Sequence, residues 1–106
     1  MILSSSVQDI GAAAFVDCKN LRLADLRAAN GLKCLERKIF SGCENFKYVL
    51  LGEGLEVIER EAFMASGLEN FVAPASLREI KNSAFKNCGN LRHVDLSACG
   101  INPAKK

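Results

Sequence analysis

The chain has 106 residues and a net charge of +2, with 49 % apolar and 25 % charged residues. This is an ordinary composition for one globular domain with a modest core. The low charge and the lack of a basic run do not favour a nucleic-acid partner. No apolar stretch approaches the roughly 18 residues that span a bilayer, so we expect no membrane insertion.

Residues 1–6 carry neither a basic region nor a long apolar region, so they do not have the pattern of a signal peptide. This leaves the compartment open. We expect the cell surface if the chain is a fragment of a longer secreted protein, and the cytoplasm otherwise.

One pattern recurs along the whole chain, and its most complete copy covers residues 77–96. Counted from Ile80, it places small or apolar residues at Ala84, Phe85, Cys88, Leu91, Val94 and Leu96. The same offsets recur from Ile10, Leu35 and Ile58, with one residue missing before Leu68. The recurrence predicts a single domain, 1–106, that is a solenoid of stacked units. We place the units at about 7–31, 32–54, 55–76 and 77–100, with partial units at both ends.

Each unit begins with a brief extended segment, at 7–10, 32–35, 55–58 and 77–80. We expect a short helical turn to follow and to carry the Ala-Phe pair. Glycine and asparagine then recur at fixed places in the units. Because both residues tolerate positive φ, we expect left-handed turn ends and bends there. The glycines are Gly42, Gly67 and Gly89, and the asparagines are Asn20, Asn45 and Asn90.

Each unit ends with a strand in which inward and outward residues alternate. The expected inward pairs are Ala24 and Leu26, Val49 and Leu51, Phe71 and Ala73, and Val94 and Leu96. The expected outward pairs are Leu23 and Asp25, Tyr48 and Leu50, Asn70 and Val72, and His93 and Asp95.

The predicted core is one large apolar side chain from each recurring position. It comprises Phe15, Phe40, Phe63, Phe85, Ile10, Leu35, Ile58, Ile80, Leu21, Phe46, Leu68, Leu91, Val49, Phe71 and Val94.

Cys18, Cys43 and Cys88 occupy the same place in three units, which indicates a small buried side chain and five reduced cysteines rather than a disulfide framework. Adjacent coils lie about 4.8 Å apart, so Cys43 and Cys88 would be too distant for a bridge. Distance alone leaves a Cys18–Cys43 bridge open.

Both ends of the chain continue the pattern. Residues 1–3 match the end of an earlier strand, and Ile101 falls where a fifth unit would start. Neither end supplies an obvious polar cap, which a solenoid needs. We therefore expect a piece of a longer array. The alternative is a short natural protein whose ends are capped irregularly or by end-to-end self-association.

The pattern resembles the unit of the BspA-like leucine-rich repeats, V-x-x-I-G-x-x-A-F-x-x-C-x-x-L-x-x-I-x-I-P. Residues 7–11 match its opening, 14–18 its middle and 71–74 its close. The chain departs from the unit at Ile39, Ser66 and the missing residue before Leu68. The resemblance runs from Val7 to about Ile101, in four copies. It implies an α/β repeat solenoid with a parallel β-sheet on one face and short helical turns. It also implies a surface, adhesive or intracellular interaction role without shared catalytic residues.

The outward strand residues form the candidate binding face, since an apolar centre with an aromatic residue and a charged rim is typical of protein-binding patches. Val57 would join this face only if the first segment of its unit faced the same way. The candidate protein-binding residues are Leu23, Tyr48, Leu50, Val72, His93 and Asp95, and the rim comprises Arg22, Lys47, Glu69, Arg92, Asp25 and Asp95.

We predict a protein-interaction module with a protein partner of unknown identity. The alternative is a structural spacer of a longer array with no binding role of its own, whose exposed apolar residues would be ordinary for a sheet surface. We expect no enzyme, metal site or cofactor, because His93 and Asp95 have no third ligand or nucleophile beside them. The acidic residues Glu53, Glu56, Glu59 and Glu61 are expected to form a solvated edge rather than a calcium site.

Overall fold

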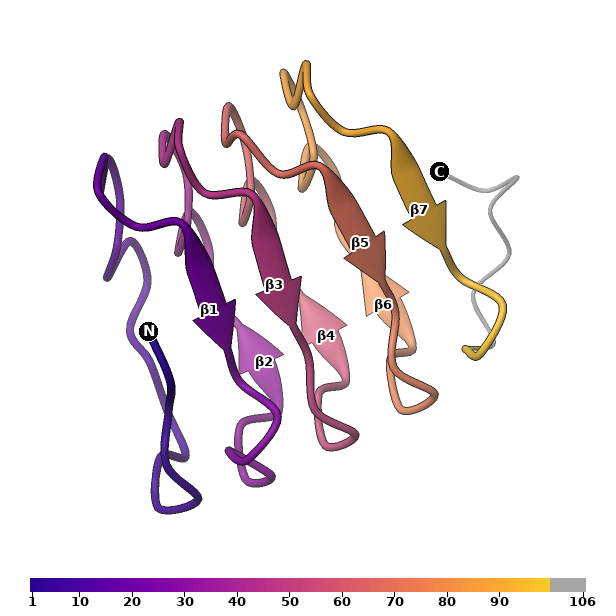
Figure 1. Ribbon diagram of the computed structural model, residues 1–106. Helices are drawn as coiled ribbons and strands as arrows, with labels where there is room; N and C mark the ends of the chain where they lie inside the picture. The colour runs from indigo at the N-terminus through magenta and orange to yellow at the C-terminus, as the bar shows by residue number, and fades with distance from the viewer. Residues whose placement is uncertain (100–106) are drawn as a thin grey trace.

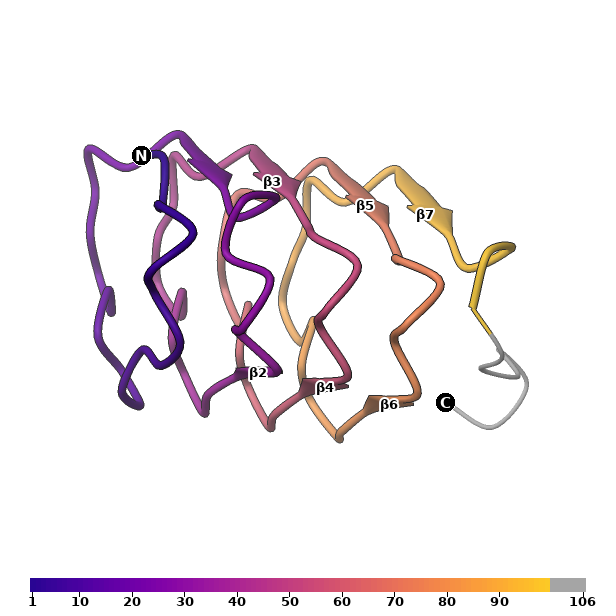
Figure 2. The ribbon, with the colours of Figure 1, turned by 90° about the horizontal axis from the view of Figure 1, so that it is seen from below.

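The computed structural model describes residues 1–99, which form a solenoid with two parallel sheets (Figure 1). The larger sheet has the order β1-β3-β5-β7 and the smaller one the order β2-β4-β6. The two sheets lie on opposite sides of the coil (Figure 2). The larger sheet contains β1 (Leu23–Asp25), β3 (Tyr48–Leu50), β5 (Asn70–Val72) and β7 (His93–Asp95). The smaller sheet contains β2 (Cys34–Leu35), β4 (Val57–Ile58) and β6 (Glu79–Ile80). The predicted repeat solenoid is therefore confirmed.

The strands of the larger sheet lie where the alternation of inward and outward residues predicts them. In β3, Tyr48 is exposed, Val49 is buried and Leu50 is half-buried. An isolated parallel bridge joins Ile2 to Asp25, and Leu3 N donates to Asp25 O at 3.0 Å. Residues 1–3 thus run beside β1 as the end of an earlier strand. The expected start of a fifth unit at Ile101 lies outside the described residues.

The turns that carry the phenylalanines are not helical, so the prediction of short helical turns is wrong. Within the described residues the structure has strands, turns and bends but no helix. The second turn shows why. Phe40 N donates to Ala62 O of the next coil at 2.8 Å, whereas Cys43 N donates to Phe40 O within the turn at 3.3 Å. Donors that bind the next coil cannot also form the i to i−4 bonds of an α-helix.

Two positions of each turn adopt positive φ, and glycine holds only one of the eight. The left-handed residues are Ala13 and Asp17, Lys38 and Gly42, Glu61 and Ala65, and Ser83 and Asn87, with φ between 58° and 76°. In the second coil, Lys38 N and Gly42 N both donate to the next coil, to Arg60 O and Met64 O. This backbone conformation points the N–H groups along the solenoid. The hydrogen bonds that it allows between coils outweigh the roughly 1–2 kcal/mol that the left-handed region costs an L-residue.

Asn20, Asn45 and Asn90 lie in turns, so the expected bends are confirmed, whereas positive φ at these asparagines and at Gly67 and Gly89 is wrong. None of these residues has positive φ. Asn45 has a different role, because its Nδ2 donates to Lys19 O of the preceding coil at 2.8 Å. Asparagine is useful here because its side-chain amide ties neighbouring coils together.

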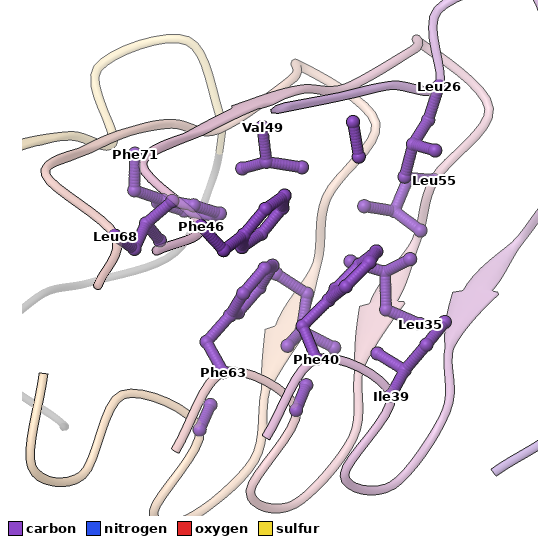
Figure 3. Packing of buried hydrophobic residues seen from close by; sticks show 14 of the residues in the cluster. Leu26, Leu35, Ile39, Phe40, Phe46, Val49, Leu55, Phe63, Leu68 and Phe71 are labelled. Carbon is purple, nitrogen blue, oxygen red and sulfur yellow. The ribbon is translucent and has the colours of Figure 1, made fainter. Parts of the chain in front are cut away.

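The core is a stack of phenylalanine rings between the two sheets (Figure 3). Phe40 and Phe63 are fully buried and lie 5.6 Å apart between ring centroids. Phe46 stacks on Phe40 at 4.6 Å, and Phe71 meets Phe63 edge-on at 6.2 Å. Offset-stacked and edge-on geometries suit the quadrupoles of aromatic rings. Several buried residues were in neither the predicted core nor the predicted inward pairs, namely Ile39, Leu32, Leu55, Leu77, Ala29, Ala62 and Ala84.

The terminal coils are less buried than the middle ones. Phe15 and Phe85, with their neighbours Ile10 and Ile80, are only partly buried. Val94 is 48 % exposed, so its assignment to the core is wrong. Among the described residues β7 pairs only with β5, so no strand covers the other side of Val94.

The cysteine position of the turns holds a small side chain, which in two of them donates a hydrogen bond to the preceding coil. Cys43 Sγ donates to Phe15 O and Cys88 Sγ donates to Phe63 O, each at 3.0 Å and each to the preceding coil. In the third unit Ser66 takes this place, and its Oγ accepts from Leu68 N at 3.4 Å. None of the five cysteines, all within residues 1–99, is in a disulfide.

Candidate functional site

The outer face of the larger sheet presents two rows of side chains. The register aligns Leu23 with Tyr48, Tyr48 with Asn70 and Asn70 with His93 in the first row. The second row lies two residues further along each strand and contains Asp25, Leu50, Val72 and Asp95. All six predicted site residues therefore lie on one sheet face.

Several of these side chains are apolar and exposed. Leu23 is 36 % exposed, Tyr48 44 % and Val72 54 %, while Leu50 is half-buried. Tyr48, Leu50 and Val72 stand on the two central strands of the sheet, and Leu23 stands on the outer strand β1. Burying them against another molecule would be favourable, since each apolar Å² removed from water contributes about 25 cal/mol.

A hollow with a volume of about 360 Å³ lies over β3 and β5. It brings together Tyr48, Leu50 and Val72 of the predicted site. The other three predicted residues, Leu23, His93 and Asp95, lie on the same face but do not line the hollow.

The hollow also includes residues from the turns that follow the strands, which the sequence analysis missed. Arg27, Glu53, Pro74 and Ala98 all line it. Each of them follows a strand by a few residues. Their position just after a predicted strand could have indicated that they lie beside the candidate face.

The charges at the start of the strands pair with one another across the coils. Lys47 Nζ lies 3.0 Å from Glu69 Oε2, and Arg92 Nη2 lies 3.6 Å from Glu69 Oε1. The hydrogen bond from Lys47 is the main reason that the pKa of Glu69 is lowered. The Glu69 carboxylate thus pairs with two cations at this edge of the face.

The ends of the outer strands carry aspartates that cap the following turns. Asp25 accepts hydrogen bonds from Arg27 Nε, Nη2 and backbone N, at 3.0, 2.9 and 3.1 Å. These bonds, that of the Arg27 side chain first, lower the pKa of Asp25 to about 2. Asp95 accepts from Ser97 Oγ at 2.6 Å and Ser97 N at 2.9 Å, and these bonds lower its pKa. Both aspartates are therefore charged at neutral pH.

Val57 does not join the candidate face, because β4 belongs to the smaller sheet on the opposite side (Figure 2). Two glutamates of the proposed acidic edge pair with the next coil instead of converging. Glu59 lies 3.2 Å from Lys81, and Glu56 lies 3.5 Å from Arg78. Over residues 1–99, no three histidine, cysteine or acidic side chains are grouped as a metal ion would require.

Comparison with known proteins identifies the family. The family model described as the BspA type leucine rich repeat region matches residues 1–102 in six copies. The chain belongs to this family. Comparison with curated proteins found no match.

Solved structures of leucine-rich repeat proteins share the fold of this BspA-type chain. A leucine-rich repeat protein from Bacteroides ovatus is 32 % identical with a TM-score of 0.81, over 90 % of this chain and 24 % of that one. A leucine rich cell surface protein from Faecalibacterium prausnitzii is 28 % identical with a TM-score of 0.78, over 84 % and 23 %. The T. pallidum leucine rich repeat protein is 23 % identical with a TM-score of 0.60, over 88 % and 56 %, and shows the fold alone. The BspA-type chain thus spans about a quarter of the length of the first two.

Membership of a leucine-rich repeat family fits an interaction module, and the absence of catalysis stays a prediction. In the part of the BspA-type chain that the structure describes, no helix is long and apolar enough to cross a bilayer.

Proposed function

We propose that this BspA-type chain binds a protein partner through the outer face of the β1-β3-β5-β7 sheet, as an adhesive or scaffolding module. The observation that carries the proposal is the group of Tyr48, Leu50 and Val72 around one hollow on that face. Protein interfaces are rich in tyrosine and aliphatic side chains at their centre and charged at their rim. The likeness to a cell surface protein supports a role at the surface.

The test is affinity capture from a host-cell surface extract and from a lysate of the source cells. Immobilised wild type is compared with a Tyr48→Asp, Leu50→Asp double variant. We expect the wild type to retain a protein that the double variant loses, because two buried charges at the centre of an interface cost several kcal/mol each. The captured protein is then purified and its affinity measured for both forms.

Val57→Asp is the control, because it places a new carboxylate on β4 of the opposite sheet. It should retain the partner. Circular dichroism must show that all three proteins are folded.

Equal affinity of the double variant and the wild type for the purified partner would refute this face as the binding site. If no form captures a protein reproducibly from either extract, a spacer role within a longer array becomes the better account.

A further inference from the structure

The middle strands of the larger sheet differ from the outer ones at one outward position. Asp25 and Asp95 occupy it in β1 and β7, and each carboxylate binds the backbone N–H two residues later. The equivalent residues of β3 and β5 are Leu50 and Val72. A side-chain oxygen at this place stabilises the turn, and an aliphatic group cannot do so.

Leu50 and Val72 do not compensate for the lost turn contact by filling the core. Val72 is 54 % exposed, and the buried residues of the two strands are their neighbours Val49 and Phe71. Leu50 and Val72 instead line the hollow beside Tyr48. With a volume of about 360 Å³, the hollow lies at the lower end of the range for ligand pockets. It therefore suits one or two apolar side chains rather than a large molecule.

The charges around the hollow are unequal on its two sides. On the β1 side, Arg27 neutralises Asp25 in a two-pronged ion pair. Glu53 lines the hollow and uses Oε1 to accept from Ala75 N at 3.1 Å. Asp95 stands next to Val72 in the register and uses Oδ1 for both Ser97 bonds.

Neither acid is neutralised by a cation of the described chain. Across residues 1–99, Glu53 and Asp95 form no ion pair with lysine or arginine, and Glu53 Oε2 and Asp95 Oδ2 have no hydrogen-bond partner. Beside the apolar hollow, the sheet face thus carries two carboxylates that pair with no lysine or arginine of residues 1–99.

We propose that the hollow receives an apolar side chain of an extended protein segment, and that a lysine or arginine next to it meets Glu53 and Asp95. The inference rests on the proposed function and names the chemistry of the partner segment. The apolar residue gives affinity by burial, and the basic residue gives orientation and selectivity. An acidic segment is disfavoured because it would place like charges together.

The test is an NMR titration of ¹⁵N-labelled protein with short glycine-serine peptides. Their two central residues are Phe-Arg, Phe-Glu or Ser-Arg. We expect Phe-Arg, at up to about 10 mM, to shift the amide signals of Tyr48, Leu50 and Val72. It should bind about two- to thirtyfold more tightly than Phe-Glu, since the two exposed ion pairs, to Glu53 and Asp95, contribute about 0.2–1 kcal/mol each. Ser-Arg should cause no shift at these residues.

A Glu53→Gln, Asp95→Asn variant should bind Phe-Arg and Phe-Glu equally. Glu79→Gln is the matched control, since Glu79 is an exposed acid on β6 of the opposite sheet, and this variant should keep the preference for Phe-Arg. Added salt should reduce the preference in the wild type.

Equal binding of Phe-Arg and Phe-Glu to the wild type would overturn the basic-partner inference while leaving the face as a site for apolar side chains. Absence of shifts at Tyr48, Leu50 and Val72 with every peptide would overturn the hollow as a site for extended segments. The capture experiment judges the proposed function separately. A partner lost by Tyr48→Asp, Leu50→Asp but bound with full affinity by Glu53→Gln, Asp95→Asn would keep the function and refute this inference.

Discussion

Phe63 lies at the centre of the aromatic stack, so its removal tests the account of the core most directly. Its ring is fully buried and packs between Phe40 at 5.6 Å and Phe85 at 5.4 Å. It also contacts Phe46 at 6.3 Å and Phe71 at 6.2 Å. Phe63→Ala would leave a cavity walled by four rings, three from the two neighbouring coils and one, Phe71, from its own coil. We expect a loss of about 3–5 kcal/mol of unfolding free energy.

Phe85→Ala is the matched comparison, because it is the same substitution at the same repeat position. Phe85 is only half-buried, and its ring contacts are Phe63 and Phe71. Less apolar surface is lost and solvent can fill the space, so we expect a cost of about half as much.

Urea denaturation followed by circular dichroism measures both costs, with similar slopes required for a valid comparison. A domain of this size has a stability on the order of 5–15 kcal/mol, so Phe63→Ala should shift the midpoint strongly or prevent folding. A cost for Phe63→Ala that is equal to or smaller than that for Phe85→Ala would refute the reasoning that the stack is the centre of stability.

Three further predictions concern the turns and the titratable groups. Ala65→Gly should stabilise the protein by about 0.5–1 kcal/mol, because Ala65 has φ of 60° and glycine adopts positive φ without strain. Ala62→Gly in the buried core should instead destabilise it. The urea midpoints of both variants, compared with that of the wild type, test the two predictions. Asp25 has a folded pKa of about 2, below its ordinary value, so the stability from its pairing with Arg27 is present above about pH 4 and is lost as pH falls toward 2. The melting temperatures of wild type and Asp25→Asn should therefore converge on acidification. A constant difference between them would contradict this. Burial, followed by the charges of two glutamates, raises the pKa of the Cys34 thiol to about 12, so little of the reactive thiolate is present at about pH 8.5. Its alkylation by iodoacetamide, followed by mass spectrometry, should be at least about a hundredfold slower than that of an unfolded cysteine peptide.

Most of the candidate face was readable from the sequence because it depends on local alternation. Tyr48, Val49 and Leu50 point out, in and out by strand geometry alone, and the repeat fixes which strand lies beside them. The residues that line the hollow could not be predicted from this alternation. Glu53 and Ala98 belong to turns of different coils, and only stacking brings them to one place.

The sequence by itself determined the solenoid and the position of its phenylalanines in the core cluster, because every coil packs against its neighbours with the same spacing of apolar residues. The tertiary structure decided the turns and the second sheet. Lys38 and Ala65 adopt positive φ, and the two-residue strands β2, β4 and β6 exist, because hydrogen bonds between coils select these conformations. Local propensity favours helical turns and left-handed glycines, and the contacts between coils outweigh both, because each added coil supplies donors and acceptors that no single unit has.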